Sequence, residues 1–357
     1  MDVKKAPAIV LAHGALSTSD GKVAHGLIRG SDRFAIGAII DPDAAGQDAG
    51  EFLDGRQRNI PVVATLDDAL VQAAQAPSYC IIGVATLGGR ITPTLRASIL
   101  EAVAAGLSIV NGLHDWLRED AELVDLAQKK GVELIDLRCP PPRRELHFWS
   151  GEIHQVRARR IAVLGTDCAL GKRTTTRLLL AELKSCQQKV EMIYTGQTGW
   201  MQGARYGLVF DSLPNDFVCG ELEHAIVTCA READPDIMLI EGQSALRNPC
   251  GPCGGEMLLS AAAHGVILQH APGREYYEDF EHLELRIPPV EDEIDLIKKY
   301  YGVPVLGVSL NGHGLSADAL VETQQALRAK LNMPVVRPLE EGVSALADAI
   351  LAASNET

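Results

Sequence analysis

Arg160-Ile-Ala-Val-Leu-Gly165-Thr-Asp-Cys-Ala-Leu-Gly171-Lys172-Arg173-Thr-Thr-Thr-Arg-Leu-Leu-Leu-Ala-Glu-Leu183 runs from an apolar segment through a glycine-bounded loop into a helical pattern. This order predicts a strand, a phosphate-binding loop and a helix. Glycines let the backbone wrap an anion without Cβ clashes, and N–H groups at the start of the helix point toward it. Lys172 adds a positive charge, and a hydroxyl of Thr174 or Thr175 could bind Mg²⁺ or a phosphate oxygen. The predicted cofactor-binding residues are Gly165, Thr166, Asp167, Cys168, Gly171, Lys172, Arg173 and Thr174.

The loop departs from the usual P-loop pattern in two places. Five residues separate its glycines instead of the usual four, and Arg173 follows the lysine where a Ser or Thr is usual. The longer loop, with Thr-Asp after the first glycine, resembles the dethiobiotin synthetase type of P-loop, which normally keeps a Thr after its lysine. Arg173 argues against ordinary Mg-ATP hydrolysis, and a phosphate-bearing cofactor remains the prediction.

The composition indicates an α/β enzyme. A chain of 357 residues with 46% hydrophobic residues, 33 glycines and few aromatics suits two domains with helices packed on parallel sheets. The net charge of −14 argues against nucleic acid or an anionic membrane as a partner. The eight scattered cysteines resemble buried free thiols, and we see neither a signal-peptide core nor an apolar run near the roughly 20 residues that span a bilayer. We therefore expect a cytoplasmic protein.

The first part of the chain, residues 1–142, alternates strand and helix patterns, which predicts a Rossmann-like parallel sheet. Helices are expected at Thr94–Ala105 and Ala121–Lys130. The turn after the first strand lacks the Gly-x-Gly-x-x-Gly pattern, which disfavours a nicotinamide cofactor, and Asp41 is interpreted as a helix cap in preference to a ribose ligand. The predicted strands are Ala8–Ala12, Phe34–Ile40, Val62–Ala64, Tyr79–Val84, Ser108–Asn111 and Glu133–Asp136.

Three prolines, Pro140 to Pro142, break regular structure and mark the predicted boundary of a second domain, residues 143–357. This domain repeats the strand–helix alternation, so the predicted fold is α/β throughout, with a Rossmann-like domain followed by a P-loop NTPase-like domain. Ligands of such sheets bind beyond the carboxyl ends of the strands. The predicted strands are Ile161–Leu164, Val190–Tyr194, Ile237–Ile240, Gly265–Gln269 and Val303–Ser309.

The segments that follow these strands supply the other candidate site residues. Gln197 and Thr198, in a glycine-flanked turn after the second strand, are predicted to contact substrate. Four carboxylates and His224 gather between Asp211 and His224, in a stretch expected to become helical at Gly220. They could bind a metal or move a proton, or merely form an acidic first helical turn. The candidate catalytic residues are Asp211, Glu241 at the end of a buried strand, and His270, whose imidazole could act as a base near neutral pH.

The loop of residues 245–256 contains Cys250-Gly-Pro-Cys253. A Cys-x-x-Cys pair could bind zinc or form a redox pair, but no second pair of ligands completes a tetrahedral zinc site. We therefore interpret the loop as a substrate-contacting segment and predict no bound metal.

These blocks together resemble the DgcN-type N-acetyltransferases, a P-loop family formerly of unknown function. The resembling residues are Gly165-Thr-Asp-Cys-x-x-Gly-Lys172, Thr195–Gly199, Asp211–Glu221 and Ile240-Glu-Gly-Gln243, and the likeness covers nearly the whole chain. It implies acetyl transfer from acetyl-CoA to the amino group of D-glutamate, in the catabolism of D-amino acids. Both substrate carboxylates would then need cations, for which Arg205, Arg247 and Arg274 are the candidates.

Two other functions stay open at this point. The chain could be an ATP-dependent ligase or kinase, with Lys172, Thr174 and Glu241 handling Mg-ATP, or a regulatory protein that senses a nucleotide. In each case we expect small-molecule ligands and a homo-oligomer.

Overall fold

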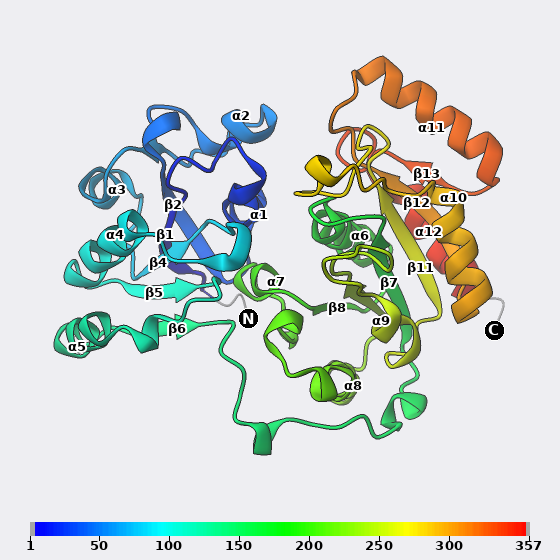
Figure 1. Cartoon of the computed structure of the whole chain (residues 1–357), viewed down its shortest axis with the longest axis horizontal. Coiled ribbons are helices and arrows are strands. Elements are labelled where there is room, and N and C mark those ends of the chain that lie inside the picture. Colours follow the sequence, from blue (N-terminus) through cyan, green and yellow to red (C-terminus); the bar gives the residue numbers. More distant parts are fainter. Residues whose placement is uncertain (1–3, 355–357) are drawn as a thin grey trace. The chain divides into compact units, whose positions relative to one another are not determined.

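The computed structural model describes residues 4–354 and divides into two compact units. The first unit extends to Pro141 and also includes Gln197–Ala204, while the second comprises Pro142–Gly196 and the residues from Arg205 onward. Each unit is a parallel β-sheet with helices, as the sequence predicted (Figure 1). No helix within residues 4–354 combines the length and apolar character needed to cross a bilayer.

The sheet of the first unit has the strand order β3-β2-β1-β4-β5-β6, which is the doubly wound order of Rossmann folds. Its strands are β1 (Ala6–Leu11), β2 (Phe34–Ile40), β3 (Val62–Val63), β4 (Tyr79–Ile82), β5 (Ser108–Asn111) and β6 (Leu134–Asp136). Its helices are α1 (Lys22–Arg29), α2 (Ala49–Asp54), α3 (Leu66–Gln72), α4 (Pro93–Ala104), α5 (Ala121–Lys130) and α7 (Gln197–Met201). Alternate residues of β1 pack on opposite faces, Ile9 against α4 residues and Val10 against α1 residues.

Asp41 follows β2 and is fully buried. Its carboxylate accepts hydrogen bonds from the backbone N–H of Asp43 (3.1 Å) and of Leu16 (3.0 Å). The carboxylate therefore caps the short 3₁₀ helix Pro42–Ala44 and holds the turn after β1, which confirms the interpretation of Asp41 as a cap.

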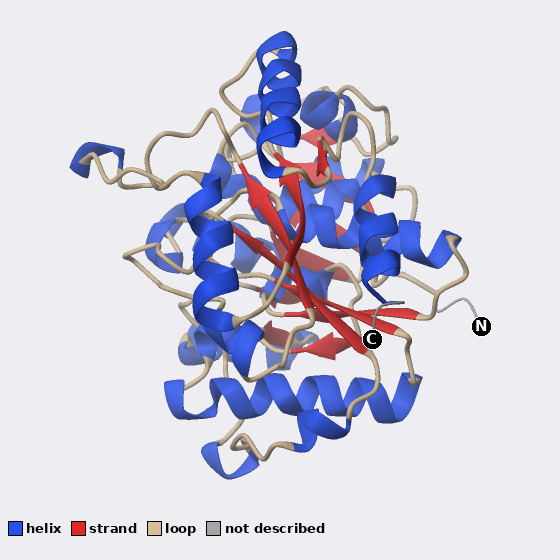
Figure 2. Ribbon diagram, turned by 90° about the vertical axis from the view of Figure 1, so that its right-hand side faces the viewer, coloured by secondary structure: helices blue, strands red, loops and turns tan. Residues whose placement is uncertain are grey.

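The sheet of the second unit has the order β13-β12-β11-β7-β10-β8-β9. Its strands are β7 (Arg159–Gly165), β8 (Val190–Tyr194), β9 (Tyr206–Gly207), β10 (Ile237–Glu241), β11 (Gly265–His270), β12 (Val305–Leu310) and β13 (Val335–Val336). Its helices are α6 (Lys172–Ser185), α8 (Asn215–Ala233), α9 (Gly255–Leu259), α10 (Val290–Leu296), α11 (Ala317–Leu331) and α12 (Ser344–Ser354). Figure 2 shows strands enclosed by helices. Alternate residues of β7 point to opposite faces of the sheet. On one face Ile161 and Val163 pack with α6 and α12, and on the other Ala162 and Leu164 pack with α8 and α9.

Helix α8 begins at Asn215, so the prediction of a helical start at Gly220 is wrong. Gly220 lies inside the helix because the chain at His147 and Phe148 passes against it. A Cβ at Gly220 would lie 2.0 Å from the carbonyl oxygen of His147. The glycine therefore marks a close approach of two backbones and not a helix boundary.

Candidate functional site

The loop between β7 and α6 lies at the carboxyl edge of the second sheet, beside the neighbouring strands β10 and β11. Gly171 precedes α6 with a left-handed φ of +96°, and Ala169 has a φ of +51°. The first N–H groups of a helix have no intrahelical acceptor, so the first turn of α6 presents donors to an anion in the loop. The backbone thus has the features of a phosphate-binding loop.

Lys172 is buried beneath this loop, with 7% of its surface exposed. Its Nζ donates hydrogen bonds to the carbonyl oxygens of Asp167 (2.6 Å) and Ser244 (2.8 Å), and burial lowers the pKa of the ammonium. Gly165 and Gly242 flank the lysine side chain, since a Cβ on either would lie 3.1 Å from its Cδ. The ammonium group is therefore held at the base of the loop, within reach of an anion that enters it.

Asp167 is fully buried, and its carboxylate is hydrogen-bonded within the protein. Its carboxylate accepts from Arg274 Nη1 (3.0 Å), the backbone N–H of Glu278 (2.8 Å) and Asn248 Nδ2 (2.9 Å). Arg274 also donates to the carbonyl oxygen of Cys168 (2.8 Å) and pairs with the Glu278 carboxylate (2.7 Å). Asp167 and Arg274 therefore both brace the loop, and the ligand roles predicted for them stay predictions.

His270, at the end of β11, shares a hydrogen bond of 3.0 Å between its Nδ1 and the Thr166 hydroxyl. His270 therefore adjoins the loop through Thr166. Burial lowers the pKa of His270 to about 4, so the assumption of an imidazole that titrates near neutrality is wrong. The ring is neutral at physiological pH and is a weak base.

The buried imidazole of His270 should make the protein less stable in acid. The pKa of His270 is about 4 in the folded chain and about 6.5 when unfolded, so the unfolded chain binds more protons between these values. Stability contributed by the neutral ring is present above pH 6.5 and is lost as the pH falls toward 4. We expect His270→Gln to reduce this acid-induced loss by on the order of 3 kcal/mol. Urea unfolding at a series of pH values measures the free energy of unfolding of each variant. His282 is exposed, so His282→Gln serves as the control. Identical pH profiles for the wild type and His270→Gln would contradict this expectation.

The hydroxyl groups that follow Lys172 are largely committed to the protein. Thr175 Oγ1 donates to Gln269 Oε1 (2.6 Å) and lies 3.2 Å from the Ser309 hydroxyl. Thr176 Oγ1 donates to the carbonyl oxygen of Lys172 (2.8 Å). Of the two threonines considered for a ligand, Thr174 on the half-buried first turn is therefore the better placed.

Glu241 ends β10 beside the loop and is 3% exposed. Its Oε1 lies 3.8 Å from Arg173 Nη1, and its Oε2 accepts a hydrogen bond from the backbone N–H of Thr195 (3.3 Å). Burial raises the pKa of this carboxyl group, and the charge of Arg173 opposes the rise. The two residues bring a buried acid and a guanidinium to the mouth of the loop.

Gln197 and Thr198 follow β8 along the chain, and their contact with a substrate stays a prediction. Both are buried in helix α7, which packs with the first unit. Gln197 Oε1 accepts from Arg138 Nη2 (3.1 Å), and Gln202 Nε2, just beyond the helix, donates to the carbonyl oxygen of Gly26 (2.6 Å). Side chains of the first unit hold this segment, although the chain reaches it directly from β8.

Arg205 and Arg247, two of the predicted carboxylate-binding cations, pair with carboxylates of the protein. Arg205 Nη2 lies 2.5 Å from Glu232 Oε2 in an exposed pair, and Arg247 Nε lies 2.6 Å from Glu293 Oε2. Burial raises the pKa of Glu293. A substrate carboxylate would have to displace the internal partner in each case.

The acidic stretch from Asp211 to His224 does not form a metal centre. Asp211 is exposed in the 3₁₀ helix Phe210–Ser212, Glu221 Oε1 accepts from the backbone N–H of His147 (2.7 Å), and buried Glu223 accepts from that of Ile153 (3.0 Å). No group of three or more His, Cys, Asp or Glu within residues 4–354 could hold a metal ion. Burial also raises the pKa of Cys253 to about 12, which disfavours a thiolate ligand in the loop of residues 245–256.

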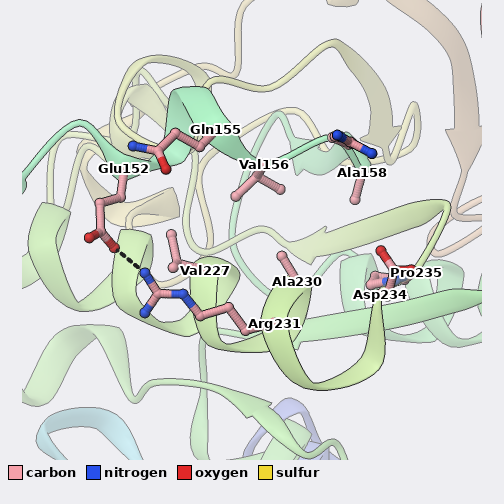
Figure 3. A pocket seen from close by; sticks show the side chains of 10 residues that line it. Glu152, Gln155, Val156, Ala158, Val227, Ala230, Arg231, Asp234 and Pro235 are labelled. Carbon is pink, nitrogen blue, oxygen red and sulfur yellow. Dashed lines mark hydrogen bonds and ion pairs between the residues drawn. The ribbon is translucent and has the colours of Figure 1, made fainter.

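A pocket of about 290 Å³ lies at the opposite, amino edge of the same sheet, and Figure 3 shows the side chains that line it. Arg157 and Ala158 precede β7, and Asp234 and Pro235 precede β10. None of the predicted site residues lines this pocket. The loop of residues 165–174, Glu241 and His270 lie at the other, carboxyl edge of the sheet.

Comparisons with known proteins place the chain among relatives of the same architecture. Residues 147–347 match a family described as "Domain of unknown function (DUF1611_C) P-loop domain", and residues 42–140 match its "(DUF1611_N) Rossmann-like domain". A crystal structure of a DUF1611 family protein from Anabaena variabilis superposes with a TM-score of 0.88 at 29% identity, covering 98% of this chain and 100% of that one.

Two curated proteins are also similar, and both are named D-glutamate N-acetyltransferase. The one from a Pseudoalteromonas species is 31% identical over 74% of this chain and 79% of its own length. The one from Tritonibacter scottomollicae is 27% identical over 81% of this chain and 84% of its own length.

Proposed function

The chain belongs to the DUF1611 family, and on that basis we propose that it is an N-acetyltransferase that moves the acetyl group of acetyl-CoA to the amino group of D-glutamate. The observation that carries the proposal is the likeness to two curated proteins of that name, which extends over about three quarters of the chain. A phosphate-binding loop with a buried lysine is compatible with a carrier that bears phosphates.

Coenzyme A carries a diphosphate and a 3′-phosphate, and we propose that the loop of residues 165–174 holds one of these groups without hydrolysing it. The predicted cofactor-binding residues contribute in different ways under this proposal. Backbone N–H groups of the loop and Lys172 would contact the phosphate oxygens. Asp167 would act indirectly, by holding the loop through Arg274.

The ammonium group of D-glutamate must lose a proton before the nitrogen attacks the thioester carbonyl. We propose Glu241 as the acceptor, because burial raises the pKa of its carboxyl group and makes its carboxylate a stronger base. His270 is less suitable because its pKa is about 4, and Asp211 is exposed to solvent. For the substrate carboxylates, Arg205, Arg247 and Arg274 remain the proposed partners. They would exchange Glu232, Glu293 and Glu278 respectively, so that Arg274 keeps its bond to Asp167.

The test is release of the CoA thiol by the purified full-length chain. With acetyl-CoA and D-glutamate we expect thiol release matched by one N-acetylglutamate per CoA, and a background rate when the amine is omitted. L-glutamate as a parallel substrate reports stereochemical preference. Folded protein that releases no thiol above background with D-glutamate would overturn the proposal.

A further inference from the structure

P-loop sites for Mg-nucleotides hold the metal with two groups. One is the hydroxyl of the Ser or Thr directly after the loop lysine, and the other is an acid at the end of a nearby strand. In this chain the residue after Lys172 is Arg173, and the acid that ends the adjacent strand is Glu241. The position of the hydroxyl ligand is therefore occupied by a cation.

Apart from Thr174, the hydroxyl groups and the acid around the loop are already engaged by the protein. Arg173 Nη1 lies 3.8 Å from Glu241 Oε1, so a guanidinium already stands beside the one carboxylate that would bind the metal. The Thr175 hydroxyl donates to Gln269, and that of Thr176 donates to a backbone carbonyl. Mg²⁺ requires oxygen ligands in a nearly octahedral arrangement and would be repelled by the guanidinium.

We infer that Arg173 takes the place of the divalent cation, so that this P-loop binds the phosphate of its carrier without Mg²⁺. A planar guanidinium matches two phosphate oxygens at once, and it remains charged at every physiological pH. Lys172 and Arg173 together supply two positive charges from consecutive residues of α6. That charge suits the diphosphate diester of coenzyme A, which carries two negative charges, better than ATP, which usually binds as its Mg²⁺ complex.

The inference deepens the proposed function and relies on it for the identity of the carrier. Titration calorimetry of the full-length chain with CoA, once in EDTA and once in excess Mg²⁺, tests the metal directly. We expect equal affinities in the two buffers. If Mg²⁺ strengthens CoA binding by about tenfold or more, or if CoA binds in neither buffer, the inference is wrong. Parallel titrations with 3′-dephospho-CoA and ATP show whether the diphosphate or the 3′-phosphate is the group recognised.

Arg173→Met removes the charge and keeps most of the length of the side chain. We expect CoA to bind about 10- to 100-fold more weakly to this variant, in EDTA and in Mg²⁺ alike. The matched control is Arg231→Met at the opposite edge of the sheet, where Arg231 pairs with Glu152 at 2.9 Å, and it should bind CoA like the wild type (Figure 3). Wild-type affinity in a folded Arg173→Met variant would overturn the inference. If that variant unfolds, Arg173→Lys provides the test. It retains the positive charge, so it should keep most of the CoA affinity measured in EDTA. Loss of CoA binding in a folded Arg173→Lys variant would contradict the inference.

Failure of this inference can be told apart from failure of the proposed function. Metal-independent CoA binding without acetylation of D-glutamate would overturn only the proposed acetyl transfer. Acetylation of D-glutamate by a protein whose CoA binding requires Mg²⁺ would overturn only the role assigned to Arg173.

Discussion

Replacing Lys172 by alanine is expected to weaken CoA binding by at least about 100-fold, since charge-assisted contacts to phosphate are among the strongest hydrogen bonds in proteins. In the wild type the ammonium is already desolvated beneath the loop and satisfied by the carbonyl oxygens of Asp167 and Ser244. A phosphate would therefore meet a donor that has already lost most of its water. Titration calorimetry with CoA measures the effect.

Two further variants separate the lost charge from lost packing. Lys172→Met keeps the methylene stem that passes Gly165 and Gly242, so it should bind CoA as weakly as the alanine variant while unfolding less readily. Lys184→Ala, an exposed position on the same helix, should bind CoA like the wild type. Unchanged affinity in both Lys172 variants would show that the loop is not a phosphate site.

Asp167→Ala should have the largest effect on stability. It removes a buried carboxylate that accepts from Arg274, Asn248 and the backbone of Glu278. Arg274 would keep its pair with Glu278, so we expect the free energy of unfolding to fall by about 3 kcal/mol, at the lower end for a broken buried ion pair. Urea-induced unfolding followed by circular dichroism measures this.

Asp125→Ala provides the matched control for that variant. Asp125 pairs with Lys129 on the surface of α5, where both side chains are more than 60% exposed, and its removal should cost less than about 0.5 kcal/mol. If both variants lowered the free energy of unfolding by the same amount, the buried contacts of Asp167 would contribute no more to stability than an exposed ion pair.

The sequence predicted the strands well because buried parallel strands are short apolar runs between turn residues. Every predicted strand forms, with ends shifted by no more than two residues. The two-residue edge strands β9 and β13 were not predicted, since so short a segment has no periodicity to detect. The loop between β7 and α6 was predictable for a related reason, because its glycines and its lysine are neighbours in sequence.

The partners within the site could not be predicted in the same way. Asp167 and Arg274 are separated by 107 residues, and only the adjacency of β7 and β11 brings them together. Asn248 and Ser244, which contact Asp167 and Lys172, lie in an irregular loop without a helical or strand pattern. The pKa of His270 likewise depends on burial by distant elements.

The assignment of helix α7 shows a third kind of limit. The strand–helix alternation places Gln197 after β8 and gives no sign that the helix joins the other unit. Trp200 and Met201 pack in the core of the first unit, but an apolar helix face does not reveal which core will cover it.

The same helix has a consequence for how the protein is made. The first unit needs residues 197–204 to complete its core, yet these emerge from the ribosome only after β7, α6 and β8 of the second. Domains usually fold in the order of their synthesis. Here the amino-terminal unit stays unfinished until part of its successor has been translated, so co-translational folding of the two is interleaved and not sequential.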